Sequence, residues 1–278
     1  MTRSARRRMR LRVTALCFAV AWGALLAAQA KKDAQEGARR YDQGDYDGAL
    51  PFLEKAAEKG VKDGQTYYQL AYIYDRQGDK PKAQAQREKA APLLAKQAAS
   101  SKGTLEDAYY LTALYAQLQR PADMQAAAAA GIERFGNKEN LSGEDLFRLG
   151  RLYQFAGRGD LSAASYRKAA AAMGQEKNPN VILYSLALIS DASTDFQARR
   201  YADAAIKLEQ AETLSPANAP PPFQTALSEL GAGKYAQARE HFGKVRDEAT
   251  TTEAQYGSAL ATHLEKAGGR LEADAEGT

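Results

Sequence analysis

The chain has 278 residues, of which 45% are hydrophobic and 26% charged, and this ordinary balance excludes a disordered protein. Its 38 basic and 34 acidic residues give a net charge of +4. Residues 1–30 include six arginines and no acidic residue, so the rest of the chain has two more acidic than basic residues and a net charge of −2. That balance provides no basic surface for nucleic acid, and we expect no nucleic-acid partner.

The segment over residues 1–30 has the composition of an export signal. Its arginines precede an uncharged run over residues 13–30, which ends in an Ala-x-Ala site at Ala30. This pattern predicts a secretory signal peptide over residues 1–30, cleaved before Lys31. An uncleaved anchor is the alternative, because the uncharged run is close to the shortest that can span a bilayer. Cys17 follows Leu16 near the start of the run instead of closing it, so we do not expect a lipoprotein.

The same segment holds the one cysteine and the one tryptophan of the chain, Cys17 and Trp22. The expected mature chain, from Lys31 on, therefore has no disulfide framework, and a stacked helical core does not need one. The Arg- and Ala-rich leader favours a bacterial protein exported to the periplasm. If the segment is not cleaved, we expect the protein to be anchored in the inner membrane and to face the periplasm.

Residues 65–91 hold the pattern that organises the rest of the chain. Apolar residues from Tyr67 to Tyr74 share one face of a helix. Gly78 then ends that helix, because glycine readily adopts the left-handed conformation needed for a turn. In the helix that follows, the small residues Ala83 and Ala90 let two helix backbones approach. The same three residues recur 34 positions earlier, as Gly44, Ala49 and Ala56, which predicts a repeated helix hairpin.

This pattern resembles the tetratricopeptide repeat (TPR), and matching residues continue along the chain. They are Leu111, Tyr115, Leu146, Leu149, Gly150, Tyr153, Tyr166, Ala169, Tyr201, Ala204, Leu208, Ala211, Tyr235, Ala238 and Phe242. The resemblance implies an all-α, right-handed solenoid of about six TPR-like helix hairpins over residues 31–268. Residues 55–74 also resemble a Sel1-like repeat, which builds a similar solenoid.

Some segments depart from the repeat. Asp195 and Glu229 stand where the repeat has tyrosine. Extra residues at 97–104 and 174–180 predict loops, and the prolines in residues 217–222 predict a break between helices. A last helix over residues 253–266, with Tyr256, Leu260 and Leu264 on one face, is expected to cap the solenoid. The polar residues 269–278 predict a disordered tail.

No arrangement of residues indicates catalysis or a bound cofactor. The two histidines, His241 and His263, have no metal-site spacing, and each is expected on a helix surface. The glycines of residues 157–159 and 231–234 complete no phosphate-binding motif. We therefore expect no enzyme activity, no cofactor and no metal.

The resemblance to the TPR implies that helix A positions facing the concave groove contact ligands. By register these are Tyr68, Tyr72 and Asp75, then Tyr109, Ala113 and Ala116, then Phe147, Arg151 and Gln154. The first residue of each set forms a row of aromatic side chains suited to a protein or peptide interface. In the alternative interpretation, these rings pack between adjacent repeats. Ala34 and Ala38 occupy two positions of the carboxylate clamp found in some TPR proteins, so we do not expect recognition of a free chain terminus.

The expected function is that of a non-catalytic scaffold of the bacterial cell envelope, which presents its groove to protein or peptide partners. Two alternatives remain open. The first is a membrane-tethered structural spacer or self-associating rod, held by an uncleaved N-terminal segment. The second is a non-catalytic subunit of an envelope enzyme complex.

Overall fold

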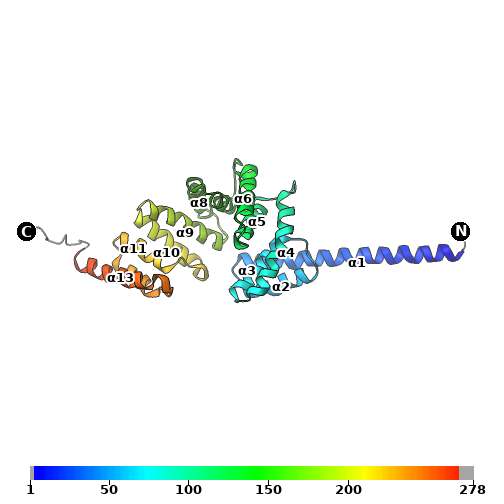
Figure 1. Cartoon of the computed structure of the whole chain (residues 1–278), viewed down its shortest axis with the longest axis horizontal. Coiled ribbons are helices and arrows are strands. Elements are labelled where there is room, and N and C mark those ends of the chain that lie inside the picture. Colours follow the sequence, from blue (N-terminus) through cyan, green and yellow to red (C-terminus); the bar gives the residue numbers. More distant parts are fainter. Residues whose placement is uncertain (1–2, 269–278) are drawn as a thin grey trace, which may run out of the picture. The chain divides into compact units, whose positions relative to one another are not determined.

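The computed structural model describes the backbone of residues 3–268 and the side chains of residues 23–268 except that of Glu248. Within this part of the chain the regular structure is entirely helical, which confirms the predicted all-α class. The helices (Figure 1) are α1 (Arg3–Asp42), α2 (Tyr46–Glu58), α3 (Gly64–Arg76), α4 (Lys80–Ala99), α5 (Leu105–Gln117), α6 (Pro121–Phe135), α7 (Gly143–Phe155), α8 (Gly159–Met173), α9 (Val181–Gln197), α10 (Tyr201–Leu214), the 3₁₀ helix η1 (Pro216–Asn218), α11 (Pro222–Gly231), α12 (Tyr235–Lys244) and α13 (Glu248–Lys266).

Consecutive helices pack in pairs, from α1 with α2 to α11 with α12, and α13 packs on the last pair. The described residues thus form six helix hairpins and a terminal helix, as the repeat predicts. They are grouped in two compact units, residues 1–135 and residues 136–278, called here unit 1 and unit 2. Each unit holds three hairpins, and each is described by itself. The prediction of one solenoid domain over residues 31–268 stays a prediction.

Small residues allow the helices of a hairpin to pack closely. Ala49, Ala56, Ala83 and Ala90 are fully buried, as their spacing predicts. Every hairpin turns through a residue with positive φ, two positions after its first helix ends. These residues are Gly44, Gly78, Gln119, Gly157, Arg199 and Gly233. Glycine adopts this conformation without the steric cost that other residues meet, so four of the six turns are unstrained.

The connecting segments agree with the sequence predictions except at one place. The prolines do interrupt the helices, since α10 ends at Leu214 and α11 begins at Pro222, and residues 174–180 do form a loop. The prediction of a loop over residues 97–104 is wrong in part. Residues 97–99 extend α4, and Gln97 stabilises that extension because its Oε1 accepts a hydrogen bond from the backbone N–H of Gly64 (2.7 Å).

The predicted packing face of the last helix is also wrong. Tyr256 and Leu260 are 73% and 39% exposed, whereas Ala254 and Ala261 on another face of α13 are buried. The reason is the ring of Phe242 on α12, which lies so close to Gly257 that an added Cβ there would be 2.4 Å from it. Small residues along α13 make room for this ring, so the helix packs through them rather than through its large apolar residues.

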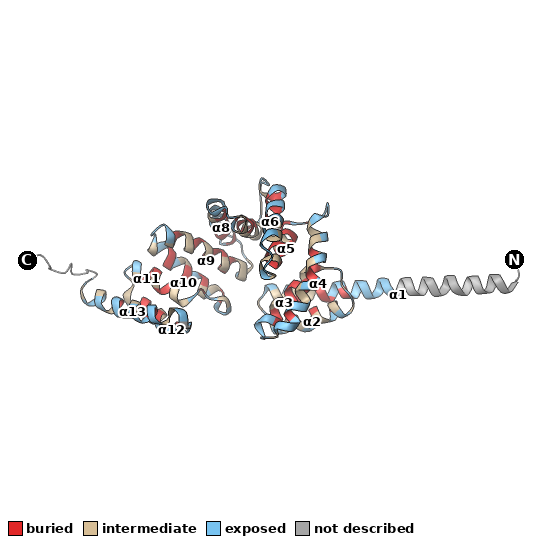
Figure 2. Ribbon diagram, in the orientation of Figure 1, coloured by how far each residue is buried: buried red, intermediate tan, exposed pale blue. Residues whose placement is uncertain are grey.

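Among the side chains of α1 that are described, burial begins at Ala30. Residues 23–29 are exposed, and Ala30, Asp33 and Ala34 are buried, as the change from blue to red on α1 in Figure 2 shows. Within the described part of the chain, no helix has the length and apolar character needed to cross a bilayer. The side chains of residues 1–22 and the predicted tail at 269–278 lie outside the described residues, so the signal peptide and the tail stay predictions.

Candidate functional site

Six tyrosines of unit 1 come together from four helices. We call them the tyrosine cluster: Tyr41 at the end of α1, Tyr46 at the start of α2, Tyr68 and Tyr72 on α3, and Tyr109 and Tyr110 on α5. Tyr68 and Tyr72 lie one turn apart on α3 and so project from the same side of it. Tyr41 and Tyr46 lie on either side of the turn between α1 and α2, so the turn brings their rings together.

The rings of the cluster contact one another in two groups. Tyr41, Tyr46 and Tyr72 form the first, with ring centroids 5.3 to 5.5 Å apart. In the second, the ring of Tyr110 lies 4.8 Å from that of Tyr68 and 5.3 Å from that of Tyr109. Such edge and tilted arrangements are favourable for aromatic rings. Burial raises the pKa of Tyr41, and the phenols of both groups act in the same direction, so the two groups are neighbours.

The cluster has a buried layer and an accessible layer. Tyr68 and Tyr110 are 7% and 8% exposed, whereas Tyr41, Tyr46, Tyr72 and Tyr109 are half-buried. The accessible rings are therefore supported from below by rings that belong to the packed interior. The rings of such a surface are apolar, and their phenol hydroxyls can form hydrogen bonds.

The guanidinium of Arg76 lies directly on the cluster. The guanidinium of Arg76 stacks 4.8 Å from the ring centroid of Tyr46 and 5.9 Å from that of Tyr72, and its Nη1 donates a hydrogen bond to the Tyr72 hydroxyl (3.4 Å). This hydrogen bond raises the pKa of Arg76 further. Among the described residues, no carboxylate pairs with Arg76, which is an exposed residue. The charge is positioned by the tyrosines and faces solvent.

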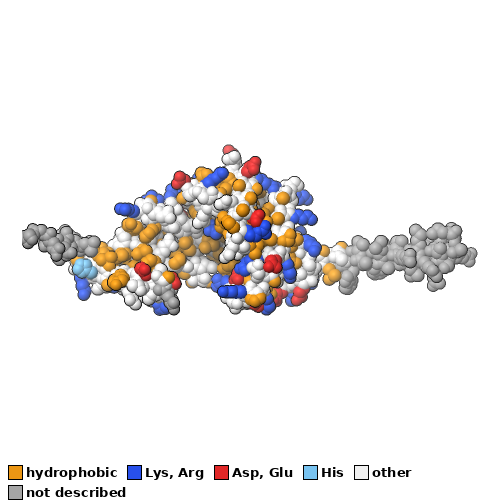
Figure 3. All heavy atoms as spheres, in the orientation of Figure 1, with side chains coloured by type: hydrophobic (Ala, Val, Ile, Leu, Met, Phe, Trp, Pro, Cys, Tyr) orange, Lys and Arg blue, Asp and Glu red, His pale blue; other side chains and the backbone are white. Residues whose placement is uncertain are grey.

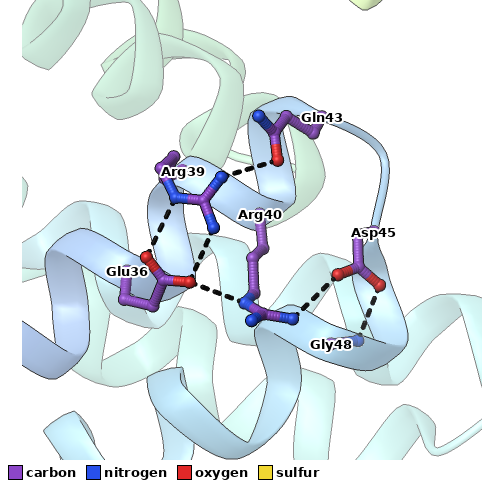
Figure 4. A network of polar contacts seen from close by, with 6 residues as sticks. All are labelled: Glu36, Arg39, Arg40, Gln43, Asp45 and Gly48. Atoms are coloured by element: carbon purple, nitrogen blue, oxygen red, sulfur yellow. Dashed lines mark hydrogen bonds and ion pairs between the residues drawn. The ribbon is translucent and has the colours of Figure 1, made fainter.

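Two arginines close to Tyr41 in the sequence are paired with carboxylates. At the hairpin of α1 and α2, Arg39 and Arg40 both bind Glu36, and Arg40 also pairs with Asp45, whose side chain accepts a hydrogen bond from Gly48 N (Figure 4). The hydrogen bonds from Arg39 and then Arg40 lower the pKa of Glu36 to about 2. This network fixes the end of α1 against the start of α2 and so positions Tyr41 and Tyr46.

A second network joins three helices beside the cluster. Arg87 of α4 pairs with Asp75 of α3 and donates a hydrogen bond to Gln117 Oε1 on α5 (3.1 Å). Gln117 in turn donates from Nε2 to the hydroxyl of Tyr68 (3.2 Å). On the face shown in Figure 3, both acidic and basic side chains lie on the surface of unit 1. The accessible tyrosines are thus framed by polar groups that satisfy one another.

The structure brings together four of the six predicted site residues. Tyr68, Tyr72 and Tyr109 belong to the tyrosine cluster, and Asp75 lies in the adjoining network. Phe147 and Arg151 belong to α7, in unit 2. Phe147 is 2% exposed and packs on Tyr166, with ring centroids 5.6 Å apart. Arg151 stacks on Phe155 (4.9 Å) and donates a hydrogen bond to Gln154 (2.8 Å).

The burial of Tyr68 and Phe147 agrees with the alternative in which the aromatic row packs between helices. A direct role in binding therefore has less support at these two residues than at Tyr72 and Tyr109, which keep accessible surface. Ala113 is buried as well, and Ala116 is half-buried. That these positions bind a ligand stays a prediction.

Sequence reasoning missed Tyr41, Tyr46, Tyr110 and Arg76. Tyr41 lies one repeat period before Asp75, so the assignment of groove positions by repeat register, extended to the first hairpin, would have indicated Tyr41 as well. Arg76 had no comparable signal, because its importance comes from rings contributed by two hairpins. Among the described residues, no group of three or more His, Cys, Asp or Glu side chains could hold a metal ion.

The comparisons with known proteins concern the fold. No family model matches the chain, and no curated protein matches it. The APC/C hetero-tetramer Cut9–Hcn1 includes a chain with 16% sequence identity and a TM-score of 0.54, and the match covers 86% of this chain and 42% of that one. The present chain thus spans less than half of that relative.

Two further solved structures show weaker likeness. They are a tetratricopeptide repeat protein from Parabacteroides merdae (16% identity, TM-score 0.44, 84% of each chain) and PilF of Pseudomonas aeruginosa (14% identity, TM-score 0.42, 87% of this chain and 93% of that one). The fold of the chain is that of TPR-like helical hairpins. No match bears on the Sel1-like resemblance of residues 55–74.

Proposed function

We propose that this protein is a non-catalytic scaffold that binds a partner protein through the tyrosine cluster and Arg76. The observation that carries the proposal is the set of half-buried rings over which an exposed guanidinium, without a carboxylate partner among the described residues, is held. Tyrosine and arginine dominate the energetics of many protein interfaces, because each combines apolar surface with hydrogen bonding. The TPR-like fold agrees with this role.

The chemistry of the surface specifies the partner. Arg76 supplies a fixed positive charge, so the complementary group is a carboxylate. The rings of Tyr46 and Tyr72 beside it supply an apolar floor. The partner segment would therefore carry an aspartate or glutamate next to an apolar or aromatic side chain. The carboxylate would bind Arg76 while the neighbouring side chain covers the tyrosines.

Photo-crosslinking in cells tests the location of this surface. A photoreactive residue is placed at Tyr72, and a control probe is placed at Ala85, an exposed residue of α4. We expect one discrete partner to be captured from Tyr72 and not from Ala85, and its crosslinked peptide to contain an acidic residue. Equal capture from both positions would contradict the proposal, and so would a crosslinked segment without Asp or Glu.

We also propose that the protein acts in the bacterial cell envelope after removal of residues 1–30. The composition of the leader supports export, and the exposure of residues 23–29 supports a boundary close to Ala30. Leu25 and Leu26 are 63% and 41% exposed, so among the described leader residues only Ala30 is buried. Mass spectrometry of the native protein tests this proposal. Cleavage predicts a chain that starts at Lys31, and an intact N-terminus would instead favour a membrane-tethered protein.

A further inference from the structure

The terminal helix α13 carries apolar residues on two sides. One side packs on α12, and its Ala254 and Ala261 are buried. The other side carries Tyr256 and Leu260, both of which are exposed. A solenoid ordinarily ends in an element whose outer face is polar, because no further repeat covers that face. The outer face of α13 departs from this rule.

Four exposed residues of α13 have the spacing of a helix-pairing surface. Glu253, Tyr256, Leu260 and His263 follow one another in steps of three, four and three residues, and we call them the α13 stripe. Steps of this kind keep side chains on one side of a helix and are the spacing through which two helices pack against each other. The two large apolar residues lie in the middle of the stripe and the two polar residues lie at its ends. Protein interfaces have the same order, an apolar centre with a polar rim.

The polar ends of the stripe are not paired within the described part of the chain. Neither the Glu253 carboxylate nor the His263 imidazole has a hydrogen bond or ion pair there. A neighbouring carboxylate of α13, that of Glu265, is already paired with Arg239 of α12. Glu253 and His263 therefore remain available to a group from another molecule.

The second histidine of the folded chain has the opposite surroundings. His241 of α12 contacts Glu229 of α11 (2.8 Å) and Glu212 of α10 (3.3 Å), and its side chain is 13% exposed. The expectation that His241 lies on a helix surface is therefore wrong. His263 is exposed, as expected.

The α13 stripe is complementary to a second copy of itself. When two copies of α13 run antiparallel about a two-fold axis at Ser258, residues equally far from Ser258 on its two sides face each other. Tyr256 and Leu260 are each two residues from Ser258, and Glu253 and His263 are each five residues from it. Tyr256 of one copy then packs on Leu260 of the other. The Glu253 carboxylate meets the His263 imidazole, which can donate an N–H to it in either charge state.

We propose that the protein forms a two-fold dimer through the α13 stripe. Ala259 is exposed and adjoins Ser258, so a small side chain lies where the two helices approach near the axis. Each copy covers the stripe of the other, so the assembly closes at two copies and does not continue into a filament. A single helix from each copy buries less surface than a standard interface, and the dimer is accordingly weak.

Sedimentation velocity of the native protein, over concentrations from about 1 to about 200 μM, tests the dimer. We expect monomers at the low end and dimers at the high end. Tyr256→Ser should weaken association at least about tenfold, because it removes the central ring of the interface. Ile206→Ser is the matched control, since Ile206 of α10 is also a large apolar residue of unit 2 and is 57% exposed. A native protein that stays monomeric or forms larger oligomers would overturn the proposal, and so would equal effects of the two substitutions.

An exchange of charges tests the antiparallel pairing. His263→Glu places two carboxylates opposite each other and should weaken the dimer about tenfold. Addition of Glu253→Lys to the same chain makes the facing charges opposite again, so the double variant should recover at least the native affinity. Circular dichroism checks that both variants are folded. If the double variant associates no better than His263→Glu, Glu253 and His263 do not face each other and the proposed dimer is wrong.

Discussion

Asp191 and Asp195 on α9 place two negative charges in the interior of unit 2, where each side chain is 3% exposed. Lys207 reaches both, with its Nζ 2.6 Å from Asp191 Oδ2. Arg167 and Arg200 contribute from the surface, at 3.4 Å from Asp191 and 2.5 Å from Asp195. A buried charge without its partner is strongly destabilising. The contact of Lys207 with the two aspartates therefore determines how much their burial lowers the stability of the folded protein.

We predict that Lys207→Met lowers the free energy of unfolding by about 3 kcal/mol, the low end for a broken buried pair because the two arginines remain. Urea denaturation followed by circular dichroism measures the effect. Lys234→Met is the control, because Lys234 pairs at 3.6 Å with Glu209, whose side chain is 72% exposed. That variant should lose less than about 1 kcal/mol. Equal losses in the two variants would contradict the argument.

The lowered pKa of Asp195 predicts an acid dependence of stability. A carboxyl whose folded-state pKa is depressed stabilises the protein above the ordinary pKa of aspartate, and this stabilisation is lost as the pH falls through the folded-state value. The difference in unfolding free energy between the native protein and Asp195→Asn should therefore be largest at neutral pH and shrink below about pH 4. A difference that stays constant over this range would show that the charge of Asp195 is not the cause.

For single residues, the sequence predicts the position of a side chain on its helix better than it predicts the side chains that contact it. Assignment of groove positions by repeat register indicated Tyr72 and Tyr109, since their place on the helix follows from the repeat alone. It could not find Arg76, whose stacking depends on rings from two hairpins. The same limit applies to His241, because its partners Glu229 and Glu212 lie 12 and 29 residues away in the sequence.

The six helix hairpins share one turn conformation. All six pass through positive φ at the same position, but Gln119 (φ 55°) and Arg199 (φ 59°) are not glycines. Both are exposed, so their side chains contribute little packing in return for this strain. A side chain in the left-handed region destabilises the folded state by about 1 to 2 kcal/mol, and replacement by glycine removes this strain. Glycine also increases the conformational freedom of the unfolded chain, which offsets part of the stability gained.

Gln119→Gly and Arg199→Gly should therefore each raise the free energy of unfolding, by about 0.5 to 1 kcal/mol. Thermal and urea unfolding of the two variants measure the gain. Ala85→Gly, within the exposed face of α4, is the matched control and should lose about 1 kcal/mol, because glycine is unfavourable inside a helix. If the turn variants lose stability as the control does, the positive φ of these turns is not a source of strain.

Hairpin positions follow from the sequence because the repeat period and the glycine turns are local signals. Helix lengths and packing faces are less predictable. Residues 97–99 contain no local signal that distinguishes a loop from an extension of α4; the contact of Gln97 with Gly64 on another helix decides it. On α13 the large apolar residues indicated the wrong face, because the ring of Phe242 requires small residues opposite it.

For the whole molecule, the fold could be predicted almost entirely, and the candidate site only in part. Each hairpin of a repeat protein contacts mainly its neighbours, so the sequence of one hairpin largely specifies its place. A binding surface depends instead on which side chains remain accessible after the hairpins have packed. Tyr68 and Phe147 show the difference: they occupy predicted groove positions, yet both are buried.

We propose that Arg76, held on Tyr46 and Tyr72, binds a carboxylate of the partner. The most direct test titrates the partner captured from Tyr72 against the native protein, Arg76→Gln and Arg120→Gln. Arg120 is a matched control, because it also stacks on a tyrosine, Tyr115 (4.8 Å), but pairs with Asp123. We predict that Arg76→Gln weakens binding about tenfold to a hundredfold, as expected for loss of a charge-assisted hydrogen bond, and that Arg120→Gln leaves it unchanged. Native affinity in Arg76→Gln, or an equal loss in both variants, would show that the charge of Arg76 does not bind the partner.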